Sequence, residues 1–275
     1  MGGRSFYFFD FDDNVIHLST PIVIFHKKTG EEKLLSSGEF AKHSKFVGKS
    51  GIYGEYMING KDEIKGSFRY FRDKDFDPGE MIISNTQPFI HDVMNALREP
   101  DYLWKAPSWN FFYYAVANKR PLSVITARGH KPETIKAGIE CMVREGHLPY
   151  LPNFLSIFPV SNLEIKKQLG DPEFKLGVPE LKRRAIRHSV ETALKRYGFN
   201  PHHRFGMSDD DAHNVELITQ EMMSLKRDYP EMSFFVIQTY PEKCVKREVL
   251  AHGTEGKVEW PASTSETQLG LFSDL

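Results

Sequence analysis

Three short apolar runs that each end in a polar cluster are the feature that most limits how this chain can fold. Ser5 to Phe9, Leu122 to Thr126 and Arg204 to Ser208 have the length of buried strands. Stretches with apolar residues at helical spacing lie between them. Strands that alternate with helices imply crossover connections and a mostly parallel sheet. We therefore expect an α/β, Rossmann-like fold with helices on both faces of the sheet.

The same periodicities predict the remaining elements. Helices are expected at residues 87–98, 109–118, 132–146, 180–197 and 215–227, and strands at residues 154–160 and, last along the chain, 234–239. After Val249 the composition shifts to Gly, Ser, Thr and Glu, with little core material. We therefore expect one folded domain over residues 1–249 and a flexible tail over residues 250–275.

A long segment separates the first apolar run from the second. Part of it, about residues 20–85, is predicted to form a small β-rich insertion, because Pro21 to His26 and Glu32 to Leu35 are typical of strands around a turn. Residues 40–80 are rich in Gly, Lys and aromatic side chains, without helical spacing. Such side chains can stack on a base and contact phosphates, or they can pack into a small subdomain. Both interpretations stay open.

The composition excludes several classes of protein. Lys and Arg number 36 and Asp and Glu 37, so the net charge of −1 argues against a strongly basic nucleic-acid binder. Cys141 and Cys244 form no Cys-x-x-Cys pair, which disfavours a disulfide framework or a cysteine zinc site. No apolar run is long enough to span a bilayer, and no secretory signal is recognisable. These features predict a cytoplasmic protein with no membrane partner.

Carboxylates gather after two of the three runs. The first run is followed by Asp10, Asp12 and Asp13, and the third by Asp209, Asp210 and Asp211. Parallel strands place such residues at one edge of the sheet, where ligands bind. Carboxylates brought together repel one another unless a cation neutralises them, and hard oxygen ligands favour Mg²⁺. A carboxylate can also attack phosphorus to form an aspartyl-phosphate. Asp10 and Asp12 point the same way in an extended segment, so that one can attack while the other handles protons.

Four segments resemble the haloacid dehalogenase (HAD) superfamily of phosphatases, in the order of that family's motifs. Asp10-Phe11-Asp12-Asp13-Asn14 is similar to motif I, and Ser123 to Arg128 is similar to the motif II strand. Lys182 resembles the motif III lysine, and Phe205 to Asp210 resembles the acidic motif IV. The segments span about residues 5 to 240. The resemblance implies a HAD-like hydrolase domain, in which the insertion between motifs I and II can form a cap over the site.

The resemblance also implies roles for the catalytic residues. Asp10 would be the nucleophile and a magnesium ligand. Asp12 would be the general acid and then the base, with its backbone carbonyl on the metal. Thr126 would hydrogen-bond the phosphoryl group, and Lys182 would neutralise the charge of nucleophile and phosphate.

The resemblance leaves alternatives open for the remaining candidate site residues. Asp209 and Asp210 would hold Mg²⁺, but the run of three aspartates allows Asp211 in place of Asp210. Asn14 stands where the family usually has Thr and can hydrogen-bond the loop of the nucleophile. Asn14 and Arg128 are the candidate substrate-binding residues. Arg128 would either bind a second substrate phosphate or pair with an acid of the site.

Other polar residues compete for a role. Lys175 and Lys195 are alternatives to Lys182 as the motif III lysine. The basic stretch from Lys182 to Arg187 is typical of a solvated helix face. The histidines lack the spacing of a zinc set and are expected at the surface or satisfied in the core; they are His130, His202, His203 and His213.

These observations predict a magnesium-dependent phosphomonoester hydrolase that forms an aspartyl-phosphate, with a small molecule or a nucleic-acid end as substrate. A phosphotransferase, a polynucleotide end phosphatase and a catalytically silent binding protein stay open. The intact pair of Asp10 and Asp12 argues against the last of these.

A short apolar segment near the C-terminus suggests a partner. It contains Gln268, Leu269, Gly270, Leu271 and Phe272, and it resembles the peptide by which bacterial replication and repair proteins dock on the sliding clamp. Such an interaction would deliver a phosphatase to DNA ends. The same apolar side chains could instead pack on this protein's own core.

Overall fold

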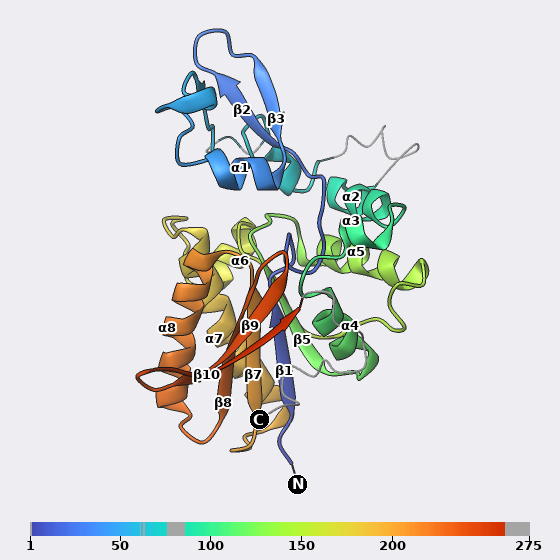
Figure 1. The fold of residues 1–275 in the computed structure, drawn as a ribbon, viewed down its shortest axis with the longest axis vertical. Coiled ribbons are helices and arrows are strands. Elements are labelled where there is room, and N and C mark those ends of the chain that lie inside the picture. The colour runs from blue at the N-terminus through green and yellow to red at the C-terminus, as the bar shows by residue number, and fades with distance from the viewer. Residues whose placement is uncertain (1, 61, 63, 76–85, 262–275) are drawn as a thin grey trace.

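The structure is built around a seven-stranded sheet. The computed structural model describes residues 2–60, 62, 64–75 and 86–261. The strands lie in the order β10-β9-β8-β7-β1-β5-β6 (Figure 1). They are β1 (Ser5–Phe9), β5 (Pro121–Thr126), β6 (Asn153–Pro159), β7 (Arg204–Asp209), β8 (Ser233–Thr239), β9 (Lys243–Leu250) and β10 (Gly253–Pro261). The five strands from β8 to β6 are parallel, and β9 and β10 continue the sheet in antiparallel pairing. The predicted α/β fold with a mostly parallel sheet is confirmed.

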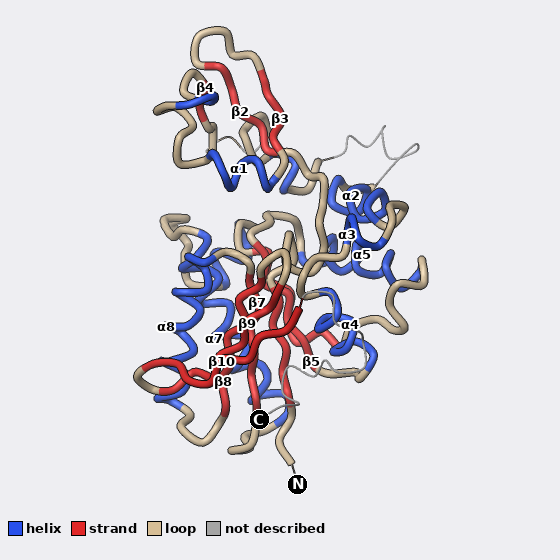
Figure 2. The backbone as a smooth tube through the Cα atoms, viewed as in Figure 1, coloured by secondary structure: helices blue, strands red, loops and turns tan. Residues whose placement is uncertain are grey.

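Helices flank this sheet on both faces (Figure 2). One face carries α2 (Pro88–Ala96), α4 (Trp109–Ala117) and α5 (Pro132–Arg144), and the other carries α6 (Leu163–Gln168), α7 (Val178–Tyr197) and α8 (Ala212–Asp228). A short helix, α3 (Asp101–Trp104), precedes α4. Among the described residues, no helix combines the length and apolar character needed to cross a membrane.

The central strand β1 divides its side chains between two hydrophobic cores. All five of its residues are buried. Tyr7 and Phe9 belong to the core beneath α2, α4 and α5, whereas Phe6 and Phe8 belong to the core beneath α7 and α8. Successive side chains of a strand point to opposite faces, and a strand covered on both faces is apolar throughout. This explains why the first apolar run does not alternate with polar residues.

The insertion is a small subdomain beyond the carboxyl ends of the parallel strands (Figure 1). Its sheet contains β2 (Ile22–His26), β3 (Glu32–Leu35) and β4 (Tyr56–Met57), and a helix, α1 (Ser37–His43), follows β3. A separate small core contains Ile24, Leu35, Val47 and Tyr53. The predicted hairpin is confirmed. The helix α1 was not predicted, because its residues lack an apolar period. The capping box between Ser36 and Glu39, which begins the helix, was the available signal.

The prediction of a tail from residue 250 is wrong for its first part, and 234–239 is not the last strand. Residues 253–261 form β10, which pairs with β9 along its whole length. Trp260 packs against Phe111 of α4, with ring centroids 5.9 Å apart. Most side chains of β10 are exposed, so this edge strand needs few apolar residues and its sequence looks like a tail. Residues 262–275, with the predicted clamp-binding peptide, lie outside the described residues.

Candidate functional site

The candidate site lies where the strand order of the large sheet reverses. From β1 the chain continues to β5 and β6 on one side and then returns to β7 on the other. Ligands bind at such a switch point, outside the carboxyl ends of the strands. The backbone N–H of Asp10 donates to the carbonyl of Ser208 at 2.9 Å, so the ends of β1 and β7 lie side by side. The two acidic clusters therefore meet.

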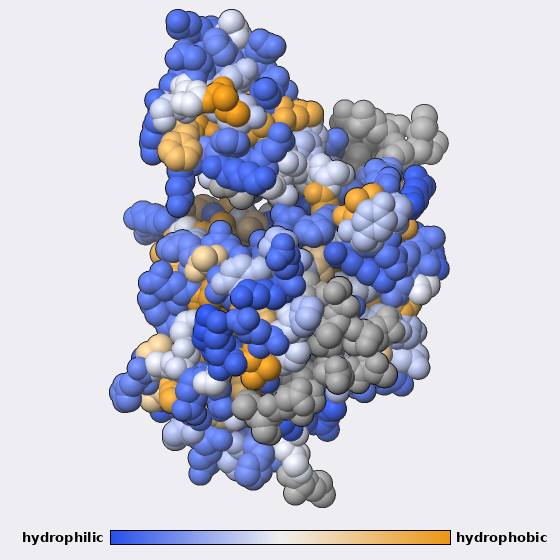
Figure 3. Space-filling model, viewed as in Figure 1, coloured by the Kyte–Doolittle hydropathy of each residue, from blue (hydrophilic) through white to orange (hydrophobic). Residues whose placement is uncertain are grey.

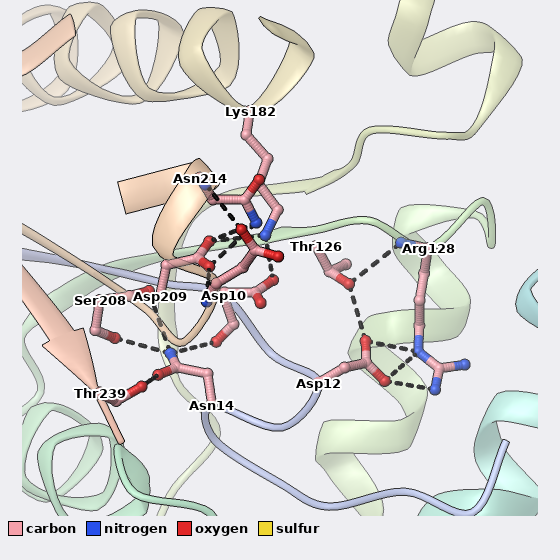
Figure 4. Close-up of polar contacts among 11 residues, drawn as sticks. Asp10, Asp12, Asn14, Thr126, Arg128, Lys182, Ser208, Asp209, Asn214 and Thr239 are labelled. Carbon is pink, nitrogen blue, oxygen red and sulfur yellow. Dashed lines mark hydrogen bonds and ion pairs between the residues drawn. The ribbon is translucent and has the colours of Figure 1, made fainter. Parts of the chain in front are cut away.

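Three carboxyl groups and one ammonium form the centre of the site. Figure 4 shows two of the carboxyl groups, Asp10 and Asp209, with the Lys182 side chain pointing toward them. Asp10, Asp209 and Asp210 each offer an oxygen, and these oxygens lie within 4.8 Å of one another. The Nζ of Lys182 reaches from α7 to within 2.9 Å of Asp10 and 2.8 Å of Asp209. The Lys182 side chain is 2% exposed, although it belongs to a strongly charged helix. Its burial and contacts distinguish it from Lys175, which is exposed and pairs with Glu173.

This cluster holds three carboxyl groups but one ammonium group. Burial alone would lower the pKa of Lys182, but Asp10 and Asp209 raise it above its usual range. Burial raises the pKa of Asp10; Lys182 opposes this rise and Asp209 adds to it. Desolvation and Asp209 also raise the pKa of Asp210 to about 7, although the residue as a whole is exposed at the mouth of the site. A divalent cation with oxygen ligands would relieve the repulsion, and this donor set fits Mg²⁺.

The loop from β7 to α8 separates the roles of its three aspartates. Asp211 accepts hydrogen bonds from the backbone N–H groups of His213 and Asn214, so it is the N-cap of α8. Asp209 is fully buried and also accepts from the side-chain amide of Asn214 at 3.1 Å. Asp210, and not Asp211, completes the cluster. Asn214 was not singled out from the sequence; its place in the first turn of a helix that follows an acidic run was the available signal.

Asn14 lies beneath the cluster, not in it. Its side chain is fully buried, and its amide nitrogen donates to the carbonyl of Asp10 at 3.0 Å and to the hydroxyl of Ser208 at 2.9 Å. Its amide oxygen accepts from Thr239 at 2.8 Å. These bonds tie β1, β7 and β8 together. They leave no access for substrate, so the predicted substrate contact at Asn14 is wrong, whereas its predicted hydrogen bond to the loop of the nucleophile is confirmed.

Asp12 faces a different set of partners. Its carboxylate accepts from the guanidinium of Arg128 at 2.6–3.0 Å and from the hydroxyl of Thr126 at 3.1 Å. Figure 4 shows it turned toward Arg128 and away from Lys182. Asp13 adopts a left-handed conformation, with φ of 56°, which bends the chain sharply after Asp12. Of the two alternatives for Arg128, the structure therefore favours pairing with an acid of the site.

A cleft of about 820 Å³ reaches the cluster between the insertion and the main body. Figure 3 shows a hollow below the insertion. The residues around it come from the insertion, the loop after β1, α3 and the loop that follows it, the start of α4 and the loop after β7; they include Asp13, His17, Gly38, Lys105, Trp109 and Asp210. Both basic residues of the lining are already paired, Lys105 with Asp101 at 2.7 Å and His17 with Asp13 at 2.9 Å.

The remaining predicted candidates lie apart from the cluster. His203 is buried and both of its ring nitrogens have partners. His130 is also buried, but neither nitrogen has a partner among the described residues. The arginines of the basic stretch in α7 form ion pairs with Glu180, Glu221 and Asp228. No protein-family model, curated protein sequence or solved structure matches this chain.

Proposed function

We propose that this protein is a magnesium-dependent phosphomonoester hydrolase of the HAD type, which acts through an aspartyl-phosphate. The observation that carries the proposal is the contact of Lys182 with both Asp10 and Asp209 at the switch point of the sheet. These three residues come from three segments that are far apart in the sequence, and each matches the motif of that family expected there. A buried ammonium between two carboxylates suits a site that binds a phosphoryl group and a cation.

The proposed reaction has two halves. Bound Mg²⁺, held by Asp10, Asp209 and Asp210, would offset the negative charge of the phosphoryl oxygens. In the first half a carboxylate oxygen of Asp10 forms a bond to phosphorus, and the bond from phosphorus to the leaving oxygen breaks while Asp12 gives that oxygen a proton. In the second half Asp12 takes a proton from water, whose oxygen displaces Asp10 from phosphorus. Inorganic phosphate and the original carboxylate result.

The charges of the side chains that line the cleft indicate which kind of substrate it suits. Its two basic side chains are paired with carboxylates, and the guanidinium of Arg128 is fully buried. A substrate with a second phosphate would therefore lack an unpaired cationic partner among the described residues that line the cleft. We favour a monophosphate with an uncharged leaving group over a polynucleotide end or a bisphosphate.

The test compares Asp10→Asn with Asp211→Asn on 4-nitrophenyl phosphate. We expect Asp10→Asn to lose turnover by about 10⁴-fold or more, because an amide cannot attack phosphorus. Asp211→Asn should retain turnover within about threefold, because Asn is an equally good N-cap. Wild-type turnover should disappear on removal of Mg²⁺ and return when Mg²⁺ is added. Full activity of Asp10→Asn would refute the mechanism, and a folded wild-type protein with no phosphatase activity on a broad phosphoester panel would favour a binding protein.

A further inference from the structure

The Arg128 side chain connects Asp12 to the insertion. It is fully buried, and its Nε and Nη2 hold both carboxylate oxygens of Asp12. Thr126 donates to the same carboxylate. The Asp12 side chain is still 23% exposed, so solvent reaches it although its orientation is set by its partners. Because Arg128 makes three of the four hydrogen bonds, it is the main determinant of that orientation.

The first residue of the insertion contacts this arginine. Thr20 is 1% exposed, and its hydroxyl accepts a hydrogen bond from Nη2 of Arg128 at 2.7 Å. The same hydroxyl donates to the carboxylate of Asp92 in α2. The position of Arg128 is therefore linked to the point where the chain leaves the main body for the insertion.

The other end of the insertion contacts the same arginine. The guanidinium carbon of Arg128 lies 4.8 Å from the ring centroid of Phe71 and 4.8 Å from that of Phe89. The backbone N–H of Gly129 donates to the carbonyl of Phe71 at 2.8 Å. Nη1 of Arg128 has no hydrogen-bond partner among the described residues, so ring contacts, and not a complete set of hydrogen bonds, hold this part of the guanidinium.

A second contact strengthens the connection at this end. Asp73 accepts from the backbone N–H of Lys131 at 2.8 Å and from the hydroxyl of Thr134 at 3.2 Å, at the start of α5. The segment that returns from the insertion is thus fastened to the same loop that carries Arg128. Both connections of the insertion converge on one side chain.

We propose that Arg128 is a positioning residue, which transmits the placement of the insertion to the carboxyl group of Asp12, the group that gives a proton to the leaving oxygen. This inference rests on the proposed function, because it assumes that Asp12 protonates the leaving oxygen. A general acid contributes about 10²–10⁴-fold to rate, and only when it lies in hydrogen-bond reach of the leaving atom. Loosening Arg128, Thr20 or Phe71 therefore reduces reactions that need this proton and spares those that do not.

The experiment measures the first turnover with enzyme in excess, so that the release of the leaving group reports formation of the aspartyl-phosphate. Two substrates are compared: 4-nitrophenyl phosphate, whose phenolate leaves without a proton, and benzyl phosphate, whose alkoxide needs one. Arg128→Lys keeps the charge but loses the forked hydrogen bonds. We expect it to slow the benzyl substrate by about 100-fold and the nitrophenyl substrate by less than about threefold. Asp12→Asn removes the proton donor itself, so it should give the largest difference in rate loss between the two substrates.

Milder variants test the link to the insertion. Thr20→Val keeps the volume but removes the hydroxyl, and Phe71→Leu replaces the ring with a smaller aliphatic side chain. Each should give the same selective loss, of about tenfold. Combining Phe71→Leu with Arg128→Lys should add little to Arg128→Lys alone, because both act through one side chain. Phe40→Leu, within the insertion, and Arg187→Lys, in a remote ion pair, are controls that should leave the ratio of the two rates unchanged.

The outcomes separate this inference from the proposed function. Equal losses on both substrates, or none on either, in folded Arg128→Lys and Phe71→Leu would overturn the positioning role while leaving the hydrolase intact. A selective loss in Arg128→Lys that is absent in both Thr20→Val and Phe71→Leu would overturn the link to the insertion. Turnover that survives Asp10→Asn would instead overturn the proposed function itself.

Discussion

His130 shows how a single buried side chain can control stability without serving the site. Its ring is 0% exposed and lies 5.5 Å from that of Phe89, and neither nitrogen has a hydrogen-bond partner among the described residues. Burial, with Arg128 nearby, lowers its pKa to about 2. The folded protein therefore holds a neutral imidazole, whereas the unfolded chain binds a proton below about pH 6.5. Stability from this residue is complete above that pH and falls as the pH is lowered.

We expect His130→Leu to be at least as stable as the wild type at pH 7, because it removes two unpaired buried polar atoms. Its advantage in the free energy of unfolding should grow by about 2 kcal/mol between pH 7 and pH 5, since each pH unit below 6.5 costs the wild type about 1.4 kcal/mol. Urea unfolding at the two pH values measures this difference.

The matched control is His203→Leu. His203 is equally buried, but its Nδ1 accepts from the backbone N–H of Arg4 at 2.9 Å and its Nε2 bonds the carbonyl of Gly198 at 3.0 Å. Removing its imidazole leaves these two backbone groups without a hydrogen-bond partner, so the free energy of unfolding at pH 7 should fall by about 1–3 kcal/mol. If both leucine variants were destabilised alike, the imidazole of His130 would have a partner after all.

At the scale of elements, packing between α2 and α5 depends on one glycine. A Cβ built at Gly138 of α5 would lie 2.4 Å from a ring carbon of Phe89 in α2. Phe89 is fully buried and also contacts the guanidinium of Arg128. The ring therefore cannot yield without disturbing the neighbours of the site.

Gly138→Ala should lower the free energy of unfolding by up to about 2 kcal/mol. Overpacking costs about 1–3 kcal/mol, which outweighs the gain of about 1 kcal/mol in helix propensity. Gly38→Ala in α1 is the control, because no atom lies within 4 Å of its added Cβ; it should be neutral or slightly stabilising. Thermal unfolding followed by circular dichroism compares the two. A gain in both variants would mean that Phe89 moves freely.

The elements also show what sequence patterns can and cannot predict. Both β1 and α7 were recognisable from the sequence. The first is a short, mostly aromatic run of the length of a buried strand, and the second is a long charged segment that ends at Gly198. The sequence of β10 carries no such pattern, because this edge strand has mostly exposed side chains and is held mainly by its backbone pairing with β9. The meeting of Asp10 with Asp209 was predictable from sheet topology. The pairing of Asp12 with Arg128 was not predictable from the sequence, because it depends on how both ends of the insertion pack against α2.

At the scale of the whole molecule, the described part of the chain ends with β10 at Pro261, near α4. Trp260 anchors this end through its contact with Phe111. Six residues separate Pro261 from Gln268, and a fully extended segment of that length reaches roughly 20 Å. The peptide of Gln268, Leu269, Leu271 and Phe272 has the polar anchor and apolar side chains that a preformed groove can bind.

The hypothesis of a clamp-binding peptide predicts that the full chain binds a bacterial sliding clamp and that a version truncated after Thr267 binds at least tenfold more weakly, a loss of about 1.4 kcal/mol or more. A synthetic peptide of residues 262–275 should compete with the full chain, because a linear segment carries its contacts without the folded domain. The mechanism at Asp10 does not depend on this segment, so truncation should leave turnover of 4-nitrophenyl phosphate unchanged. Equal clamp binding by both versions would show that residues 268–272 are not the docking peptide. Binding by neither version would exclude the clamp as a partner and would agree with the uncharged leaving group that the cleft favours.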